Sequence, residues 1–361
     1  MARSLCIFGS TGSRKTTQIK WLSRYIAEVT GKATLLLSLS GGGWAPCDPE
    51  IAAGMISAYR CDAAVTPLFV LRKISQGYWP LYPDKINEAL LAIQSGDQSP
   101  TTMHEASLTR IDFSQFGGLA VEDWTAISSL IMRFLPDKGI NVGGENRFSI
   151  AKSGVSSSFG QVGVVDGNLV SESFGSNIWA DYNYTKNTLS GLVTSFNSLP
   201  FHTVLYTAME GKTTEDGEKL SKPIYSPEIA GKKAPAECGS WVGDLIHAQD
   251  YPLPVVVKVP NPSGEGEIDQ TIMRTTVRFF YTKHPDPDTG IMFPAKPRCA
   301  PERIAELDRI FPGGYFEPEW GATWGIDRYI REVEKLTESA AQDESLKGWR
   351  ERMDAKLGRA R

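Results

Sequence analysis

Three features that would point to a functional class are missing from this chain of 361 residues. Its five cysteines are odd in number, lie far apart and form no Cys-x-x-Cys pair, which excludes the usual zinc and dithiol motifs. No apolar run approaches the ~20 residues that cross a bilayer, and no charged segment followed by an apolar one opens the chain. The net charge of −4 gives no general reason to expect nucleic acid, so a DNA-binding surface would have to be a local basic patch. We expect a cytoplasmic protein with reduced thiols and no membrane partner.

A glycine-rich stretch, IFGSTGSRKTT at residues 7–17, is the most informative feature that is present. It follows a short apolar run and opens a segment with apolar residues at helical spacing, which predicts a strand, a phosphate loop and a helix. In such a loop, glycines let backbone N–H groups face phosphate oxygens, a lysine reaches the β- and γ-phosphates, and a hydroxyl binds Mg²⁺. The residues expected to hold a nucleotide are Gly9, Ser10, Thr11, Gly12, Ser13, Arg14, Lys15, Thr16 and Thr17.

Arg14 departs from the usual pattern, because a glycine normally stands directly before the lysine. Either Arg14 tolerates the local backbone and points its guanidinium outward or toward phosphate, or it marks a loop that no longer binds nucleotide. The alternative to a nucleotide site is a Gly/Ser-rich turn before a helix, with no ligand. That alternative explains poorly why Lys-Thr-Thr stands at the helix start, so we favour a working nucleotide site.

A second apolar strand, over residues 117–121, ends in Glu122 and Asp123 and is followed by a predicted helix over residues 124–135. An acid at that point can hold Mg²⁺ opposite the phosphate loop, directly or through water. Strand ends often carry acids, so this assignment draws its weight from the loop upstream. We expect Asp123 in the metal-binding role, with Glu122 as the alternate.

The remaining patterns predict an α/β fold with a mostly parallel sheet. An antiparallel extension of that sheet is expected from the β-rich residues 241–282. Buried strands are expected at residues 4–8, 33–39, 55–59 and 202–208, and helices at 15–29, 67–75, 83–95, 178–199, 303–311 and 327–336, before a charged helical tail at 344–361.

Two irregular segments are candidates for contact with a polynucleotide. Residues 141–177 are rich in Gly and Ser and too long for an ordinary connection, and Arg147 and Lys152 give them basic character. A mobile surface insertion is the alternative for this segment. Residues 211–233 form the second candidate, because they are polar and carry several lysines.

The order of phosphate loop, acid-ended strand, long helix and a strand ending in Thr-Ala-Met-Glu resembles the RecA-type P-loop ATPase core. More closely, it resembles the ATPases encoded by bacteriophages that include RecA-core recombinases and single-strand annealing proteins. The motifs that carry the resemblance are residues 9–17, residues 53–56 leading to 77–80, and residues 121–123. The resemblance covers roughly residues 3–300 and implies a RecA-like domain over residues 1–300, with residues 301–361 as a helical appendage.

The resemblance also implies ATP and Mg²⁺ as ligands. Lys15 would bind the β- and γ-phosphates, Thr16 and Asp123 would bind Mg²⁺, and Thr207 or Glu210 would sense the γ-phosphate. The residues that would take part in catalysis are Lys15, Glu122, Asp123 and Glu210.

Hydrolysis is expected to be weak, because the RecA-type core uses a glutamate after its second strand to orient water. Residues 38–43 offer only serines, a leucine and glycines at that place. In the same core, the DNA-contacting loops would correspond to residues 141–177 and 211–233. A subunit boundary usually completes such a site, and the candidates to act across it are Lys212, Lys232, Lys233 and Arg298.

Three functions follow as hypotheses. The first is an ATP-binding and ATP-hydrolysing phage protein of the host cytoplasm that acts on single-stranded DNA in recombination, annealing or replication, as a homo-oligomer or with a phage protein partner. The second is a virion or assembly protein that keeps a nucleotide-binding fold with little or no turnover. A small-molecule kinase is a weaker third, because it would need an acceptor site and a lid that the sequence does not reveal.

Overall fold

A computed structural model describes most of the chain, and all structural statements below refer to the described residues. These are residues 3–39, 45–61, 67–78, 111–137, 141–142, 145–146, 162–165, 168–171, 179–213, 224–229, 237–262, 264, 266–285, 292–318 and 322–341. The predicted helices at 83–95 and 344–361, and most of residues 141–177 and 211–233, lie outside these ranges.

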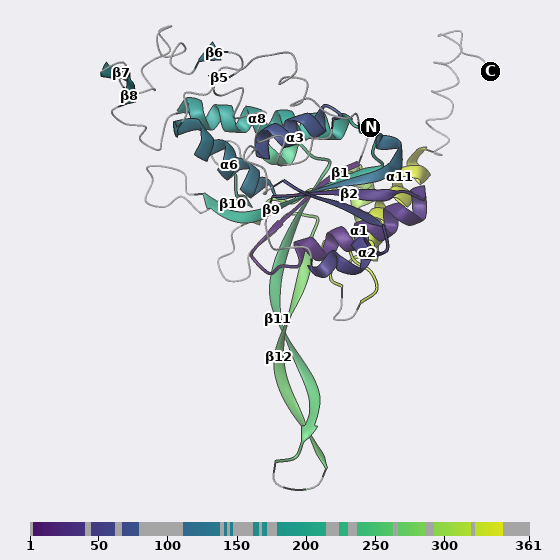
Figure 1. Ribbon diagram of the computed structural model, residues 1–361. Coiled ribbons are helices and arrows are strands. Elements are labelled where there is room, and N and C mark those ends of the chain that lie inside the picture. The colour runs from purple at the N-terminus through teal and green to yellow at the C-terminus, as the bar shows by residue number, and fades with distance from the viewer. Residues whose placement is uncertain are drawn as a thin grey trace, which may run out of the picture.

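A nine-stranded mixed sheet forms the centre of the protein (Figure 1). Strands β11, β1, β9, β4, β2 and β3 lie side by side in that order and are parallel to one another, whereas β12, β15 and β10 pair antiparallel. This arrangement confirms the predicted fold class. The strands are β1 (Arg3–Gly9), β2 (Ala33–Ser38), β3 (Ile56–Arg60), β4 (Phe116–Glu122), β9 (Thr203–Thr213), β10 (Ile224–Pro227), β11 (Asp244–Pro260), β12 (Glu267–Phe280) and β15 (Tyr315–Phe316).

Helices cover both faces of the sheet (Figure 1). One layer holds α1 (Lys15–Thr30), α2 (Asp48–Ala52), α10 (Pro301–Ile310) and α11 (Ile326–Ala341), and the other holds α3 (Pro67–Ser75), α6 (Trp124–Asp137) and α8 (Trp179–Ser198). The shorter elements are three 3₁₀ turns (Ala45–Cys47, Phe113–Gln115 and Cys238–Ser240) and the small strand pairs β5 (Asn141–Val142) with β6 (Glu145–Asn146), β7 (Val162–Val165) with β8 (Asn168–Ser171), and β13 (His284–Pro285) with β14 (Met292–Phe293).

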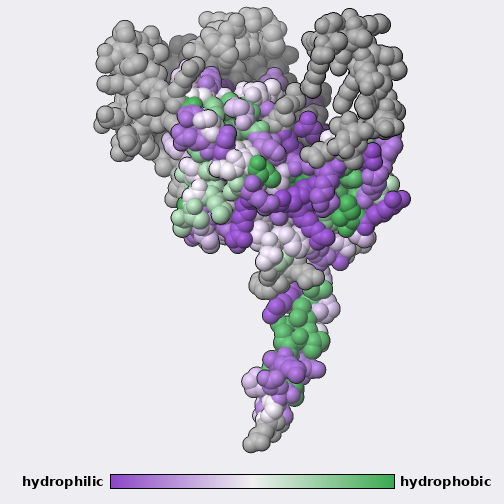
Figure 2. All heavy atoms as spheres, turned by 90° about the vertical axis from the view of Figure 1, so that its right-hand side faces the viewer, coloured by the Kyte–Doolittle hydropathy of each residue, from purple (hydrophilic) through white to green (hydrophobic). Residues whose placement is uncertain are grey.

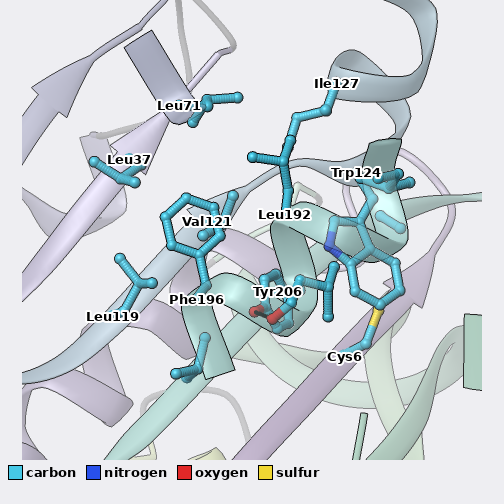
Figure 3. Packing of buried hydrophobic residues seen from close by; sticks show 14 of the residues in the cluster. Cys6, Leu37, Leu71, Leu119, Val121, Trp124, Ile127, Leu192, Phe196 and Tyr206 are labelled. Atoms are coloured by element: carbon cyan, nitrogen blue, oxygen red, sulfur yellow. Dashed lines mark hydrogen bonds between the residues drawn. The ribbon is translucent and has the colours of Figure 1, made fainter. Parts of the chain in front are cut away.

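Alternation along β1 builds a separate apolar core on each face of the sheet. Cys6 and Phe8 belong to the core under α3, α6 and α8, whereas Leu5 and Ile7 belong to the core under α1, α10 and α11. Successive strand residues point to opposite faces, so a strand that is apolar throughout is buried on both. Figure 3 shows the first core, where the ring of Trp124 lies 5.0 Å from that of Tyr206, centroid to centroid.

A long two-stranded ribbon, formed by β11 and β12, extends far beyond the sheet (Figure 1). Its partners run from the pair His247–Phe280 at the base to the pair Pro260–Glu267 near the tip. Strand β11 continues without a break through Pro252. Because β1 ends opposite Ala248, the strand beyond that point has a free edge, and a proline is tolerated there.

The distal ribbon exposes apolar side chains. Val256 and Met273 are 63% and 64% exposed, and Leu253 and Ile268 are 44% and 42% exposed. Figure 2 shows apolar surface partway along the ribbon. A two-stranded ribbon alone in water is marginally stable, so the apolar surface invites contact with another molecule.

The described residues after 300 pack against the main body. Leu307, Phe311, Tyr329 and Val333 are buried in the same core as α1, and β15 joins the main sheet. The apolar side chains of α10 and α11 therefore pack on the same face of the sheet as α1. No helix of the described residues is long and apolar enough to span a membrane.

Candidate functional site

The glycine-rich loop joins the end of β1 to the start of α1. Gly9 lies so close to β11 that a Cβ there would sit 2.2 Å from the carbonyl oxygen of Ala248, which leaves no room for any side chain. Gly12 adopts φ +86°, a conformation that other residues rarely adopt. Ser13 closes the loop, since its Oγ donates a hydrogen bond of 2.7 Å to the carbonyl of Ser10.

Arg14 has the left-handed backbone that explains why a glycine usually stands at this position. Its φ and ψ are 54° and 28°, and it is the only non-glycine with positive φ among the described residues. Its guanidinium donates a hydrogen bond of 3.2 Å to the carbonyl of Thr275 on β12, pointing away from the loop. The backbone therefore accommodates Arg14, and its side chain is directed to β12; whether the loop still binds nucleotide stays a prediction.

Lys15 begins α1 and places its ammonium group inside the loop. Its Nζ donates hydrogen bonds of 2.8 and 2.6 Å to the carbonyls of Gly9 and Ser10, and contacts Ser13 Oγ at 3.3 Å. Burial lowers the pKa of Lys15, and the nearby carboxylates, Asp123 foremost, oppose that shift. A phosphate group that entered the loop would meet this ammonium at once.

Glu122 is the acid that meets the loop. The hydroxyl of Thr16 donates a hydrogen bond of 2.5 Å to Glu122 Oε1, and Ser38 Oγ donates one of 3.3 Å to Oε2. The residue is 6% exposed. Burial raises the pKa of Glu122, with a further contribution from Asp123, while the two hydroxyls and Lys15 act in the opposite direction.

Asp123 accepts a hydrogen bond from the start of α6 rather than from Thr16. Its Oδ1 accepts a hydrogen bond of 2.6 Å from the backbone N–H of Ala126, so it caps the N-terminus of α6. Burial raises the pKa of Asp123, and Lys15 partly offsets the shift. The sequence placed Asp123 opposite Thr16, but that contact belongs to Glu122, the alternate, because β4 keeps its strand alternation through Glu122 and Asp123 already starts the next element.

Thr207 lies within the sheet, two residues before the level of the loop. It is paired with Ile7 of β1, whereas Met209 is paired with Gly9. Thr207 is buried, and its Oγ1 has no hydrogen-bond partner among the described residues. An unpaired buried hydroxyl is costly, so Thr207 is a candidate to bind an atom that enters from the loop side.

Glu210, which the sequence placed near the γ-phosphate, contacts a buried histidine that the sequence did not single out. His247 Nε2 lies 2.9 Å from Glu210 Oε2, and His247 Nδ1 lies 3.3 Å from His284 Nε2. Both imidazoles are buried between Phe280 and Phe293. The polar His247 between the apolar Ile246 and Ala248 was the local signal that could have pointed to this pair.

Ser10 and Asp250 are two further polar residues at the rim of the loop. Ser10 Oγ donates a hydrogen bond of 3.1 Å to Asp250 of β11, a residue that the sequence analysis missed. Arg298, a candidate to act across a subunit boundary, lies near Arg3, at the edge where the strands begin, and that role stays a prediction. The side chains of the lysines proposed with it fall outside the described residues.

Together these contacts place Lys15, its neighbour Thr16 and an acid-ended strand around one loop, with β9 inserted between β1 and β4. The fold is an α/β fold with a mostly parallel sheet, and this assignment rests on the strand order. Whether the loop binds a nucleotide stays a prediction.

Comparisons with known proteins add little to this assignment. No protein-family model and no curated protein matches the chain. Similar solved structures include a KaiC-like protein of the archaeon Pyrococcus horikoshii, which is 10% identical. The alignment covers 81% of this chain and 89% of that protein's chain, with a TM-score of 0.31. The RadB recombinase is 14% identical. Its alignment covers 76% of this chain and 86% of the recombinase chain, with a TM-score of 0.28. Likenesses this remote carry no argument about function.

Proposed function

We propose that the protein binds ATP with Mg²⁺ in the loop formed by residues 9–17 and hydrolyses it slowly. The observation that carries the proposal is the hydrogen bond of Thr16 to Glu122 at the mouth of that loop. It puts a hydroxyl and a carboxylate together, and Mg²⁺ favours such oxygen ligands. The left-handed backbone at Arg14 supports the proposal further, because the loop keeps its shape without the usual glycine.

Each residue of the site has a role in this proposal. Lys15 binds the β- and γ-phosphates, and Thr16 and Glu122 hold Mg²⁺, which neutralises phosphate charge. These residues fit a metal ion. Burial raises the pKa of Glu122, and a bound cation would favour its ionised form. Thr207, with its unpaired hydroxyl, is the candidate sensor of the γ-phosphate.

Slow hydrolysis is proposed because, among the described residues, each carboxylate near Lys15 already has a hydrogen-bond partner. Besides Glu122, these acids are Asp123, Asp250 and Glu210. Asp123 caps α6 through Oδ1, Asp250 accepts a hydrogen bond from Ser10, and Glu210 is hydrogen-bonded to His247. Each acid would have to leave or share its present partner to orient a water molecule.

We propose single-stranded DNA as the polymer partner of a phage-type oligomer. The support is the sequence resemblance and the path of β9, which carries Thr207 and Glu210 and then enters residues 211–233. A second candidate is an assembly protein with little turnover. The exposed apolar residues of the ribbon, Val256 and Met273 among them, favour that alternative, because such surface fits a protein partner better than phosphates.

Purified protein with ATP, in Mg²⁺ and in EDTA, tests the proposal when nucleotide binding and phosphate release are measured separately. Tighter binding in Mg²⁺ is expected, with slow release of phosphate. No binding in either condition would overturn the proposal.

Titration with single-stranded DNA at several salt concentrations separates the two partners. Contacts to phosphates would weaken binding by about 0.7 log units per log unit of salt for each phosphate neutralised. Absence of DNA binding at ~50 mM salt, together with a stable protein assembly, would favour the second candidate.

A further inference from the structure

A small cavity of about 180 Å³ opens beside the first turn of α1, next to the phosphate loop. Three parts of the chain meet there. They are Arg14 with the first turns of α1, which carry Lys20 and Trp21, then β12 with Phe279, and the segment before α11 with Trp324. The cavity therefore combines aromatic walls with two cationic side chains. Neither the phosphate loop nor the acids at the end of β4 account for it.

Close packing holds these walls in place. Gln18 Oε1 accepts a hydrogen bond of 2.9 Å from the backbone N–H of Ile326. A Cβ on Gly325 would lie 2.3 Å from the ring of Trp21, so the backbone of this segment rests directly on α1. The guanidinium of Arg328 lies 4.8 Å from the ring centre of Trp324, which fixes that ring from one side.

The cavity and the phosphate loop are adjacent on the same helical turn. Arg14 and Thr17, which line the cavity, flank Lys15 and Thr16, whose side chains contact the loop and Glu122. Since Arg14 and Thr17 belong both to the loop of residues 9–17 and to the cavity lining, the cavity borders the loop directly. The occupant best suited to aromatic walls beside a cation is flat, aromatic and edged with hydrogen-bonding atoms.

We propose that this cavity binds the base of the nucleotide whose phosphates occupy the loop, and that it favours a purine. The inference rests on the proposed function. A purine offers a larger stacking surface to Trp324 than a pyrimidine does, while the volume is too small for a protein segment. Residues from the end of the chain thus complete a site that begins at its ninth residue.

Calorimetric titration of the full chain with ATP, CTP and inorganic tripolyphosphate tests the proposal. Wild type should bind ATP at least tenfold more tightly than tripolyphosphate and more tightly than CTP, because a stacked base contributes about that much affinity. Trp324→Ala should weaken ATP about tenfold and leave tripolyphosphate unchanged. Trp324→Phe, which keeps an aromatic wall, should retain most of the affinity for ATP.

Ala322→Trp keeps the proposal testable if the loss of Trp324 unfolds the chain. Ala322 lines the same cavity, so a large side chain there fills the space without removing core. This variant should also lose ATP affinity but keep tripolyphosphate binding, with thermal unfolding as the check on folding. Equal affinity of wild type for ATP and tripolyphosphate, or equal loss of both ligands in the variants, overturns the inference alone. Failure of wild type to bind either ligand overturns the proposed function and the inference together.

Discussion

Thr16 in the first turn of α1 and Glu122 at the end of β4 are joined by a hydrogen bond of 2.5 Å from the threonine hydroxyl to the carboxylate. The two residues stand 106 positions apart in the chain. Strand β1, which leads into the loop before Thr16, and strand β4, which carries Glu122, are not neighbours, since β9 lies between them. The contact shows which of the two acids at the end of β4 faces the loop.

Replacing Glu122 with glutamine keeps the shape of the side chain and removes its charge. We expect Mg²⁺ to tighten ATP binding by Glu122→Gln about tenfold less than it does for wild type, since a charge-assisted contact contributes about 1.5–3 kcal/mol. Binding in EDTA should change little. Calorimetry with and without Mg²⁺ measures both quantities.

Asp123→Asn is the matched control, because it makes the same chemical change one residue later. Asp123 caps α6 through Oδ1, and asparagine retains an oxygen that can accept the bond from Ala126. Its Mg²⁺ effect should stay close to that of wild type. A larger loss in Asp123→Asn than in Glu122→Gln would return the metal-binding role to Asp123.

The sequence was sufficient for the loop and for the class of fold, because both depend on local patterns. Lys15 and Thr16 stand where a strand gives way to a helix, and alternation marks the buried strands. The choice between Glu122 and Asp123 depended on where β4 ends. A capping signal was present, since an aspartate three residues before a backbone N–H of a predicted helix is a preferred N-cap.

Long-range contacts could not be predicted in the same way. Trp324 lies beside Trp21 only because the apolar stripe of α11 docks on the face shared with α1. His247 meets Glu210 because β11 and β9 flank β1. Nothing in the local sequence fixes which strands flank β1, so these pairs required the strand order.

Lys15→Ala tests the phosphate site. The substitution removes a charge-assisted phosphate contact, so we expect ATP affinity to fall by roughly tenfold or more. Lys32→Ala is the control, because Lys32 is exposed and lies beyond the far end of α1. A fluorescent ATP analogue reports both affinities. Equal affinity of wild type and Lys15→Ala, with the fold intact, would refute the assignment.

Arg14→Gly and Arg14→Ala separate backbone strain from side-chain contact. Both variants lose the hydrogen bond to the carbonyl of Thr275, but only glycine adopts the left-handed backbone without a steric cost. Because that cost is about 1–2 kcal/mol for other residues, Arg14→Gly should unfold at a higher urea concentration than Arg14→Ala. Urea unfolding of the two variants measures the difference. Equal midpoints would contradict the left-handed backbone at this residue.

Glu122→Gln should also change how stability depends on pH. Burial raises the pKa of Glu122 above its ordinary value of 4.5, so between those two values the folded chain holds a proton that the unfolded chain has released. Wild type therefore loses stability as pH rises through that window, whereas glutamine has no proton to release. Below pH 4.5 the two proteins should differ least, and by pH 7 Glu122→Gln should be the more stable. Asp123 is unchanged in both proteins, so the difference between their urea-unfolding free energies, measured from pH 4 to 8, isolates Glu122. If the difference stays constant across that range, ionisation of the buried Glu122 does not lower the free energy of unfolding.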